Sequence, residues 1–226
     1  MTLYKSTILL ATCSSIALTA LAAPEIKQTL YQESRTTITR DNQSQTVTRK
    51  VWIKHPGRLR MEETIGPATR ISVSNGVDYW VAVPSQKKGI HHRLTPQQAS
   101  LLAKQLNVDL DMLPKFMASG AKKVRREKVN GVLCDVYQRA KKEQLTLTLW
   151  IPVTGPRLAQ KQEESGIIHA AAQMGEPMRT HILKSTTDYL KWQVDQPIAD
   201  SEFAPPPGIK YQEIKAAPAP AAPKKR

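Results

Sequence analysis

Few side chains in this sequence could carry out chemistry, and their spacing does not favour it. Histidines bind metal ions and transfer protons, but here none stands at the spacing of a metal-binding motif. The five histidines are His55, His91, His92, His169 and His181. The sequence also lacks Gly-x-Ser-x-Gly, His-Glu-x-x-His, Cys-x-x-Cys and phosphate-loop motifs. We therefore expect no metal site and no cofactor.

The adjacent acidic residues and the cysteine also argue against catalysis. Glu62 and Glu63 are neighbours in a predicted strand, so their side chains lie on opposite faces and cannot share a proton as a dyad. Cys134 lies in the strand-like run VLCDVY, which favours a half-buried apolar thiol over a nucleophile. The sequence therefore indicates a binding protein and not an enzyme, with no catalytic residue.

The charge of the chain limits its partners. The 226 residues carry a formal net charge of +14 at pH 7, which raises nucleic acid as a partner. However, the cations are scattered along the sequence and are not interleaved with stacking aromatic residues. We expect a monomer that binds no nucleic acid and whose basic surface meets anionic membranes or acidic partners.

Residues 1–22 have the composition of a secretory signal peptide. Lys5 is their one charged residue, an apolar stretch follows it, and the triplet Ala20-Leu21-Ala22 favours cleavage after Ala22. A membrane anchor is the alternative, but polar residues interrupt the apolar stretch, and a spanning helix needs roughly 20 apolar residues. We expect export, and a mature chain whose one cysteine forms no internal disulfide.

Between Leu30 and His92, runs of alternating apolar and polar residues are separated by turn residues. This pattern is typical of an antiparallel meander with one apolar face. Asn75-Gly76 is the dipeptide best suited to a type I′ hairpin turn. The predicted strands cover 30–40, 45–54, 58–64 and 68–74, followed by the apolar run that Pro84 ends.

Helical spacing replaces the alternation after Thr95. Thr95-Pro96-Gln97-Gln98 supplies an N-cap, a first-turn proline and a capping-box glutamine, which predicts a helix from Pro96. Asp109 could cap a second short helix that Gly120 would end.

Strands resume after the helices, at 123–129, 132–139 and 144–151. Residues 165–175 are expected to form a loop or helix, and 178–194 a last pair of strands. The Ala/Pro-rich basic end, 215–226, is expected to be a disordered tail.

A sheet of about ten strands must bury its apolar face. Two short helices would cover only part of it, so an apolar cavity could remain; alternation alone fits a filled core equally well. The residues predicted to line the cavity are Val51, Ile53, Leu59, Met61, Ile71, Val73, Tyr79, Val81, Leu102, Leu106, Leu113, Phe116, Leu145, Leu147 and Leu149.

Three segments are familiar in their order and spacing. They are 51–60, 74–84 and 200–209, which read VWIKHPGRLR, SNGVDYWVAVP and DSEFAPPPGI. Together they resemble the LolA-like superfamily, which includes the lipoprotein-sorting carriers of the bacterial periplasm. The resemblance covers most of residues 23–214, which we expect to be one domain.

The resemblance implies a mainly β fold with a small α part: a curved antiparallel sheet in an unclosed barrel, with helices as a plug or lid. It further implies a periplasmic carrier or chaperone that binds lipoprotein acyl chains or another lipid and passes them from a membrane-bound donor to an acceptor. An envelope sensor of lipids or lipoproteins, with a filled core, is the alternative.

The resemblance also makes His55 a candidate lid latch. In the carriers an arginine just before the proline ties the lid to the barrel, and here His55 stands in that place. Histidine, unlike arginine, changes its charge near physiological pH.

Overall fold

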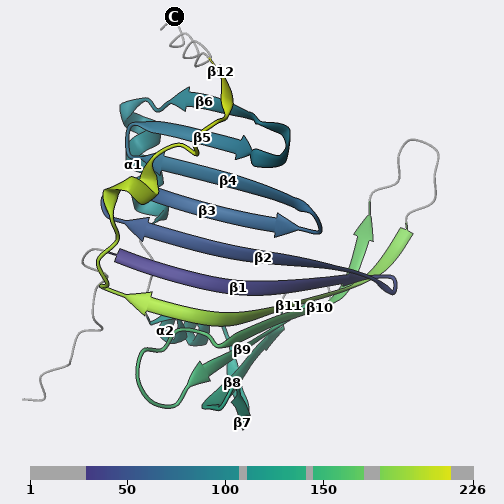
Figure 1. The fold of residues 1–226 in the computed structure, drawn as a ribbon. Coiled ribbons are helices and arrows are strands. Elements are labelled where there is room, and N and C mark those ends of the chain that lie inside the picture. Colours follow the sequence, from purple (N-terminus) through teal and green to yellow (C-terminus); the bar gives the residue numbers. More distant parts are fainter. Residues whose placement is uncertain (1–28, 107–110, 141–144, 171–178, 215–226) are drawn as a thin grey trace, which may run out of the picture.

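In the computed structural model, the described residues 29–106, 111–140, 145–170 and 179–214 form one large sheet with two short α-helices (Figure 1). The helices are α1 (Pro96–Gln105) and α2 (Met112–Ala118), and the 3₁₀ turns are η1 (Pro84–Gln86) and η3 (Asp200–Phe203). The strands are β1 (Thr29–Arg40), β2 (Gln43–Lys54), β3 (Arg58–Ile65), β4 (Ala68–Asn75), β5 (Asp78–Val83), β6 (Lys88–Arg93), β7 (Lys122–Val129), β8 (Val132–Ala140), β9 (Thr146–Pro152), β10 (Lys161–Ala170), β11 (Arg179–Val194) and β12 (Lys210–Glu213).

The sheet curves without closing into a barrel, because its two end strands, β12 and β7, lie apart (Figure 1). The strand order is β12-β6-β5-β4-β3-β2-β1-β11-β10-β9-β8-β7. The predicted mainly β, unclosed architecture is confirmed. The expectation of about ten antiparallel strands differs from the structure in two respects: the sheet of the described residues has 12 strands, and β12 pairs with β6 in parallel.

The region before the last strand also differs from the prediction. Residues 165–170, expected to be loop or helix, belong to β10, while 171–175 lie outside the described residues. The expected strand pair is instead one strand, β11, which pairs with β10 on one side and β1 on the other. The start of β10, KQEE, has no apolar alternation and therefore gives no strand signal.

The two helices begin and end largely where the sequence predicts. Thr95 caps α1 and forms the complete capping box with Gln98. The cap of α2 is Asp111, whose side chain accepts a bond from the Leu113 backbone, and not Asp109, which lies outside the described residues. Gly120, with φ of +90°, follows the end of α2.

Strand register defines the two faces of the sheet. We call the helix face the one that carries α1 and α2; Leu30, Ile53 and Leu59 lie opposite one another across β1, β2 and β3 on this face. Leu30 and Ile53 are 1% and 5% exposed and pack with Leu106, the C-cap residue of α1. At α1, therefore, the helix face is filled by apolar side chains.

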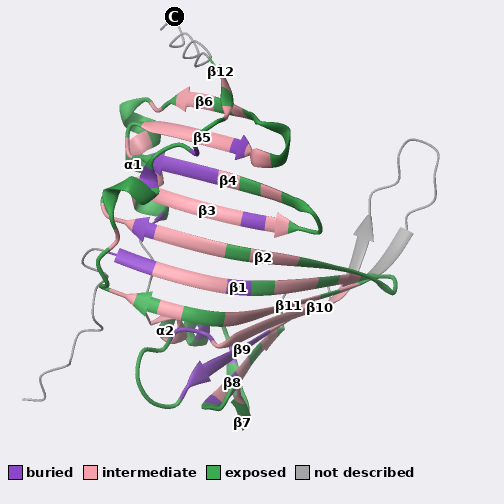
Figure 2. Cartoon of the chain, viewed as in Figure 1, coloured by how far each residue is buried: buried purple, intermediate pink, exposed green. Residues whose placement is uncertain are grey.

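The other face is crossed by residues 195–209, which we call the strap, between β11 and β12 (Figure 1). On this strap face Tyr31, Trp52, Arg60 and Val73 form one row across β1 to β4. Arg60 donates to the Glu202 carbonyl of the strap at 3.2 Å. Figure 2 shows that buried residues of β1, β2 and β4 lie at the end of the strands where the strap crosses.

Candidate functional site

An apolar pocket lies between α2 and the helix face of β8, β9 and β10. Its volume is about 310 Å³. Phe116 and Leu149, which are 7% and 2% exposed, belong to the core cluster beneath α2 and form the floor. The described residues that line the pocket are Met112, Lys115, Phe116, Ser119, Arg139, Leu147, Leu149 and Gln162.

Of the fifteen predicted cavity residues, the pocket contains Phe116, Leu147 and Leu149. Leu113 and Leu145 are half-buried nearby but do not line it. Val51, Ile53, Leu59, Leu102 and Leu106 pack together in the α1 cluster.

Register decides the position of the remaining predicted residues. Met61 lies opposite Ser72, and Ser72 opposite Val81, so Met61 and Val81 are on the helix face, as is Tyr79 opposite Ser74. Ile71 and Val73 occupy the alternate positions of β4 and therefore lie on the strap face. The prediction that these two residues share a cavity wall with Met61 was wrong.

Sequence reasoning missed Arg139, the most unusual lining residue. Its Cζ lies 5.4 Å from the centre of the Phe116 ring, a cation–π contact. Its Nε is buried and has no hydrogen-bond partner among the described residues. Because Arg139 and Tyr137 stand two residues apart in β8, alternation would have placed both on the same face of the sheet. The position of Arg139 opposite Leu147 of β9 depends on the strand register, which alternation does not reveal.

A polar cluster lies farther along the helix face. Glu63 of β3 is 8% exposed and binds Arg49 of β2 at 2.6 Å and Arg70 of β4. Burial disfavours the charged carboxylate, but its bonds with the two arginines outweigh this effect, and the pKa of Glu63 is lowered. These residues interrupt the apolar surface of the helix face.

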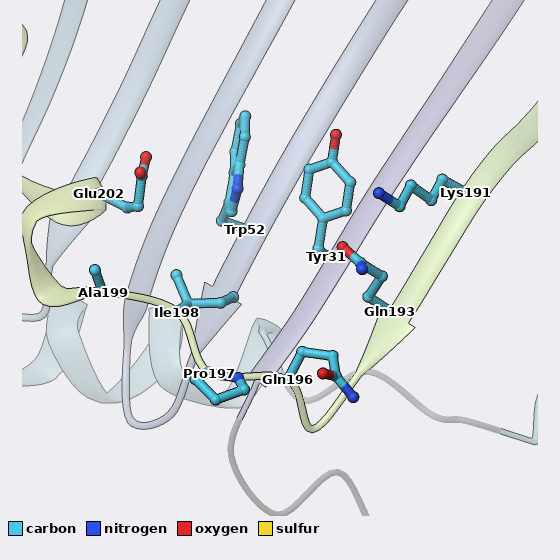
Figure 3. Close-up of a pocket in the computed structure, with 9 residues that line it drawn as sticks. All are labelled: Tyr31, Trp52, Lys191, Gln193, Gln196, Pro197, Ile198, Ala199 and Glu202. Atoms are coloured by element: carbon cyan, nitrogen blue, oxygen red, sulfur yellow. The ribbon is translucent and has the colours of Figure 1, made fainter.

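A second pocket, of about 320 Å³, lies on the strap face between the strap and β11, β1 and β2 (Figure 3). Trp52 and Tyr31 stand on the sheet with ring centres 5.1 Å apart, and Lys191 lies over Tyr31 at 5.6 Å. Burial, followed by the charge of Glu33, raises the pKa of Tyr31 to about 12. The lining is more polar than that of the α2 pocket, because it includes Lys191, Gln193, Gln196 and Glu202.

His55 lies in the turn between β2 and β3. Its Nε2 is buried and has no hydrogen-bond partner among the described residues, so the structure shows no Nε2 bond to α1. The turn nevertheless reaches the helix, because a Cβ built on Gly57 would lie 3.9 Å from Cβ of Ala103. A role for His55 as a latch remains a prediction.

The other candidate residues have structural partners. His91 Nε2 lies 2.9 Å from Asp78 Oδ1, and the His91 ring stacks on Trp80. Cys134 is buried, and its burial raises the pKa of the thiol. Within the described ranges, no group of three or more His, Cys, Asp or Glu side chains could hold a metal ion. None of the described helices has the length and apolar character needed to span a membrane.

Comparisons with known proteins find distant similarity to solved structures. No family model matches the sequence. No curated protein matches it either. A LolA superfamily protein from Nitrosomonas europaea is similar in structure, with 17% identity and a TM-score of 0.32 over 79% of this chain and 90% of that one.

Two further structures are similar over comparable lengths. An outer membrane lipoprotein-sorting protein domain from Vibrio parahaemolyticus shares 9% identity, with a TM-score of 0.30 over 78% of this chain and 89% of that one. A DUF1329 family protein from Desulfovibrio piger shares 14% identity, with a TM-score of 0.33 over 78% and 90%. Identities this low leave function to be argued from the side chains of the pocket.

Proposed function

We propose that this chain is a periplasmic carrier that binds an acyl chain of a lipoprotein, or of another lipid, and passes it towards the outer membrane. The observation that carries the proposal is the pocket of about 310 Å³ between α2 and the sheet. Its floor is apolar, and its volume lies within the range of small-ligand sites. The signal peptide expected at residues 1–22 supports export.

The energetics of an apolar ligand suit such a pocket. Burial of each methylene group contributes about 0.8 kcal/mol, so about ten methylenes supply the roughly 8 kcal/mol of micromolar binding before ordering costs. Met112 and Ser119, at the two ends of α2, both line the pocket. A small shift of this seven-residue helix would therefore widen the pocket and admit the chain.

A second candidate function is an envelope lipid or lipoprotein sensor with a filled core. The observation that favours it is the α1 cluster, where Leu102 and Leu106 pack directly on Leu30 and Ile53 of the sheet. A sensor would retain its ligand and signal through a protein partner. A carrier would release its ligand to an acceptor.

Binding of an environment-sensitive fluorescent fatty acid to the purified protein tests the pocket. Leu147 lines it, so Leu147→Trp should fill it and weaken binding at least tenfold. Leu133→Trp is the matched control, because Leu133 is 42% exposed on neighbouring β8 and does not line the pocket. Both variants should melt within a few degrees of the unmodified protein.

Two results would count against this proposal. Absence of saturable binding by the folded protein would favour the filled core. Equal binding by the two variants would show that the ligand binds outside this pocket. The carrier and sensor functions are distinguished by mixing the lipid-loaded protein with vesicles that hold outer-membrane acceptors. Transfer of the fluorescent lipid supports a carrier, and its retention supports a sensor.

A further inference from the structure

Arg139 adds a positive charge to a pocket whose floor is apolar. Arginine side chains carry a permanent positive charge in proteins. A buried charge normally has a hydrogen-bonded partner of opposite charge, because leaving water is costly. Nε of Arg139 is buried without an acceptor among the described residues. The contact with Phe116 satisfies the face of the guanidinium but not its Nε–H group.

Among the described residues, no carboxylate binds this Nε. Among the described residues that line the pocket, none is acidic, and the second cation, Lys115, has an interaction of its own. Leu147 of β9 lies between Arg139 of β8 and Glu164 of β10, opposite each of them. Glu164 has an interaction of its own. The pocket therefore combines an apolar floor with positive charge and hydrogen-bond donors.

The charged end of Arg139 lies beside the apolar floor of the pocket, over the Phe116 ring. Leu149 is 2% exposed and lies with Phe116 at the floor, whereas Leu147, one alternate position along β9, is half-buried. Arg139 lies opposite Leu147 and not opposite Leu149. A ligand whose alkyl chain lies on Leu149 would thus have its polar end within reach of the guanidinium.

We propose that this pocket selects an amphiphile with one alkyl chain and an anionic oxygen head group, which the guanidinium of Arg139 binds. A planar guanidinium suits carboxylate and phosphate oxygens, and charge-assisted bonds of this kind are strong. The inference rests on the proposed function but narrows it, since it names the chemistry of the ligand's polar end. A fatty acid and a phosphate-bearing lipid share this chemistry.

Binding of laurate, dodecyl phosphate and dodecanol tests the selection with one chain length and three head groups. The protein is titrated with each ligand at about pH 8, where the carboxylate is ionised, by displacement of an apolar dye. Laurate, dodecyl phosphate or both should bind about tenfold or more tightly than dodecanol. The relative affinities of the two anions identify the head group as carboxylate or phosphate.

Variants of Arg139 then assign the preference. Arg139→Met should bring the anions to within about twofold of dodecanol while dodecanol binding is retained, which also shows that the pocket is intact. Arg139→Lys keeps the charge without the planar fork, and should keep an intermediate preference. Arg93→Met is the control for net charge, because Arg93 is exposed at the end of β6 and does not line the pocket.

Each remaining outcome overturns the inference. Equal affinity of the unmodified protein for laurate, dodecyl phosphate and dodecanol means that Arg139 only stacks on Phe116. If the preference for anions survives in Arg139→Met, or is lost to the same extent in Arg93→Met, then it arises from the net charge of the protein and not from Arg139. In all these cases the proposed lipid-binding function survives, whereas failure of every ligand to displace the dye removes both.

Discussion

Asp200 of the strap accepts a bond from Lys54 of β2, with 2.5 Å between Oδ1 and Nζ. Arg58 of β3 binds the same carboxylate oxygen at 2.7 Å. The bond from Lys54, followed by that from Arg58, lowers the pKa of Asp200 to about 2. One carboxylate thus joins the strap to both strands that flank the His55 turn.

The first prediction concerns the pH dependence of this attachment. Because the folded pKa of about 2 lies below the unfolded value of about 3.9, the contribution of Asp200 is fully present above about pH 4 and is lost as pH falls towards 2. Asp200→Asn should therefore lower the melting temperature at neutral pH, and the difference should vanish towards pH 2. Asp195→Asn, in the same strap but without a described ion pair, should show no such trend. Parallel curves for the two variants would contradict the prediction.

The second prediction concerns Glu63. Glu63→Gln leaves Arg49 and Arg70 facing one another without the shared carboxylate, and should cost about 1–3 kcal/mol of unfolding free energy in urea at neutral pH. Because the folded pKa of Glu63 is lowered, this cost should shrink as pH falls below about 4.3. The exposed Glu213→Gln should change stability by less than about 0.5 kcal/mol. An equally stable Glu63 variant would show that the cluster contributes nothing.

The third prediction tests which face Val73 occupies. Val73 is fully buried on the strap face, so Val73→Ala should cost about 1–3 kcal/mol of stability and leave fatty-acid affinity unchanged. Phe116→Leu, at the floor of the α2 pocket, should change affinity as well as stability. Both are measured by urea unfolding and by titration with the fluorescent fatty acid. Loss of affinity in the folded Val73 variant would place its side chain at the ligand.

The fourth prediction concerns His55 as a lid latch. If His55 holds α1, His55→Arg should strengthen the hold, slow release of a bound dye and remove the pH dependence of the release rate. The measurement is the rate of dye release between about pH 5.5 and 7.5, across the range where histidines titrate. His92→Arg is the control histidine, since His92 lies 3.3 Å from Gln98 of α1 but outside the turn. Identical release curves for the unmodified protein and His55→Arg would exclude a latch.

Much of the fold was predictable because its strongest signals are local. The alternation of β2 and β3 and the capping box of α1 each specify a conformation within a few residues. The turn predicted at Asn75-Gly76 is present, but it is not of type I′, because Asn75 belongs to β4 and has no positive φ. β12 gives no such signal, since it has four residues and pairs with a strand far away in the sequence. Its pairing depends on the path of the strap, which alternation does not reveal.

The candidate site was less predictable, because alternation separates the faces of one strand but does not relate them to the next. β4 shows the difficulty clearly. Ser72 and Ser74 are buried on the helix face, while the apolar Ile71 and Val73 lie on the strap face. The usual rule that the apolar positions mark the helix-covered face therefore fails in this strand. Arg139 was missed because a charged residue in a strand is ordinarily assigned to solvent.

The two ends of the sheet differ in how they limit self-association. Unpaired backbone groups of an edge strand are a template for addition of strands from other copies, which leads to aggregation. The edge strand β7 reads KKVRREKV, and a second copy placed beside it would bring like charges together. At the other edge, β12 is only four residues long and offers little to pair with. A sheet this large can therefore remain open at both ends and still resist growth into fibrils.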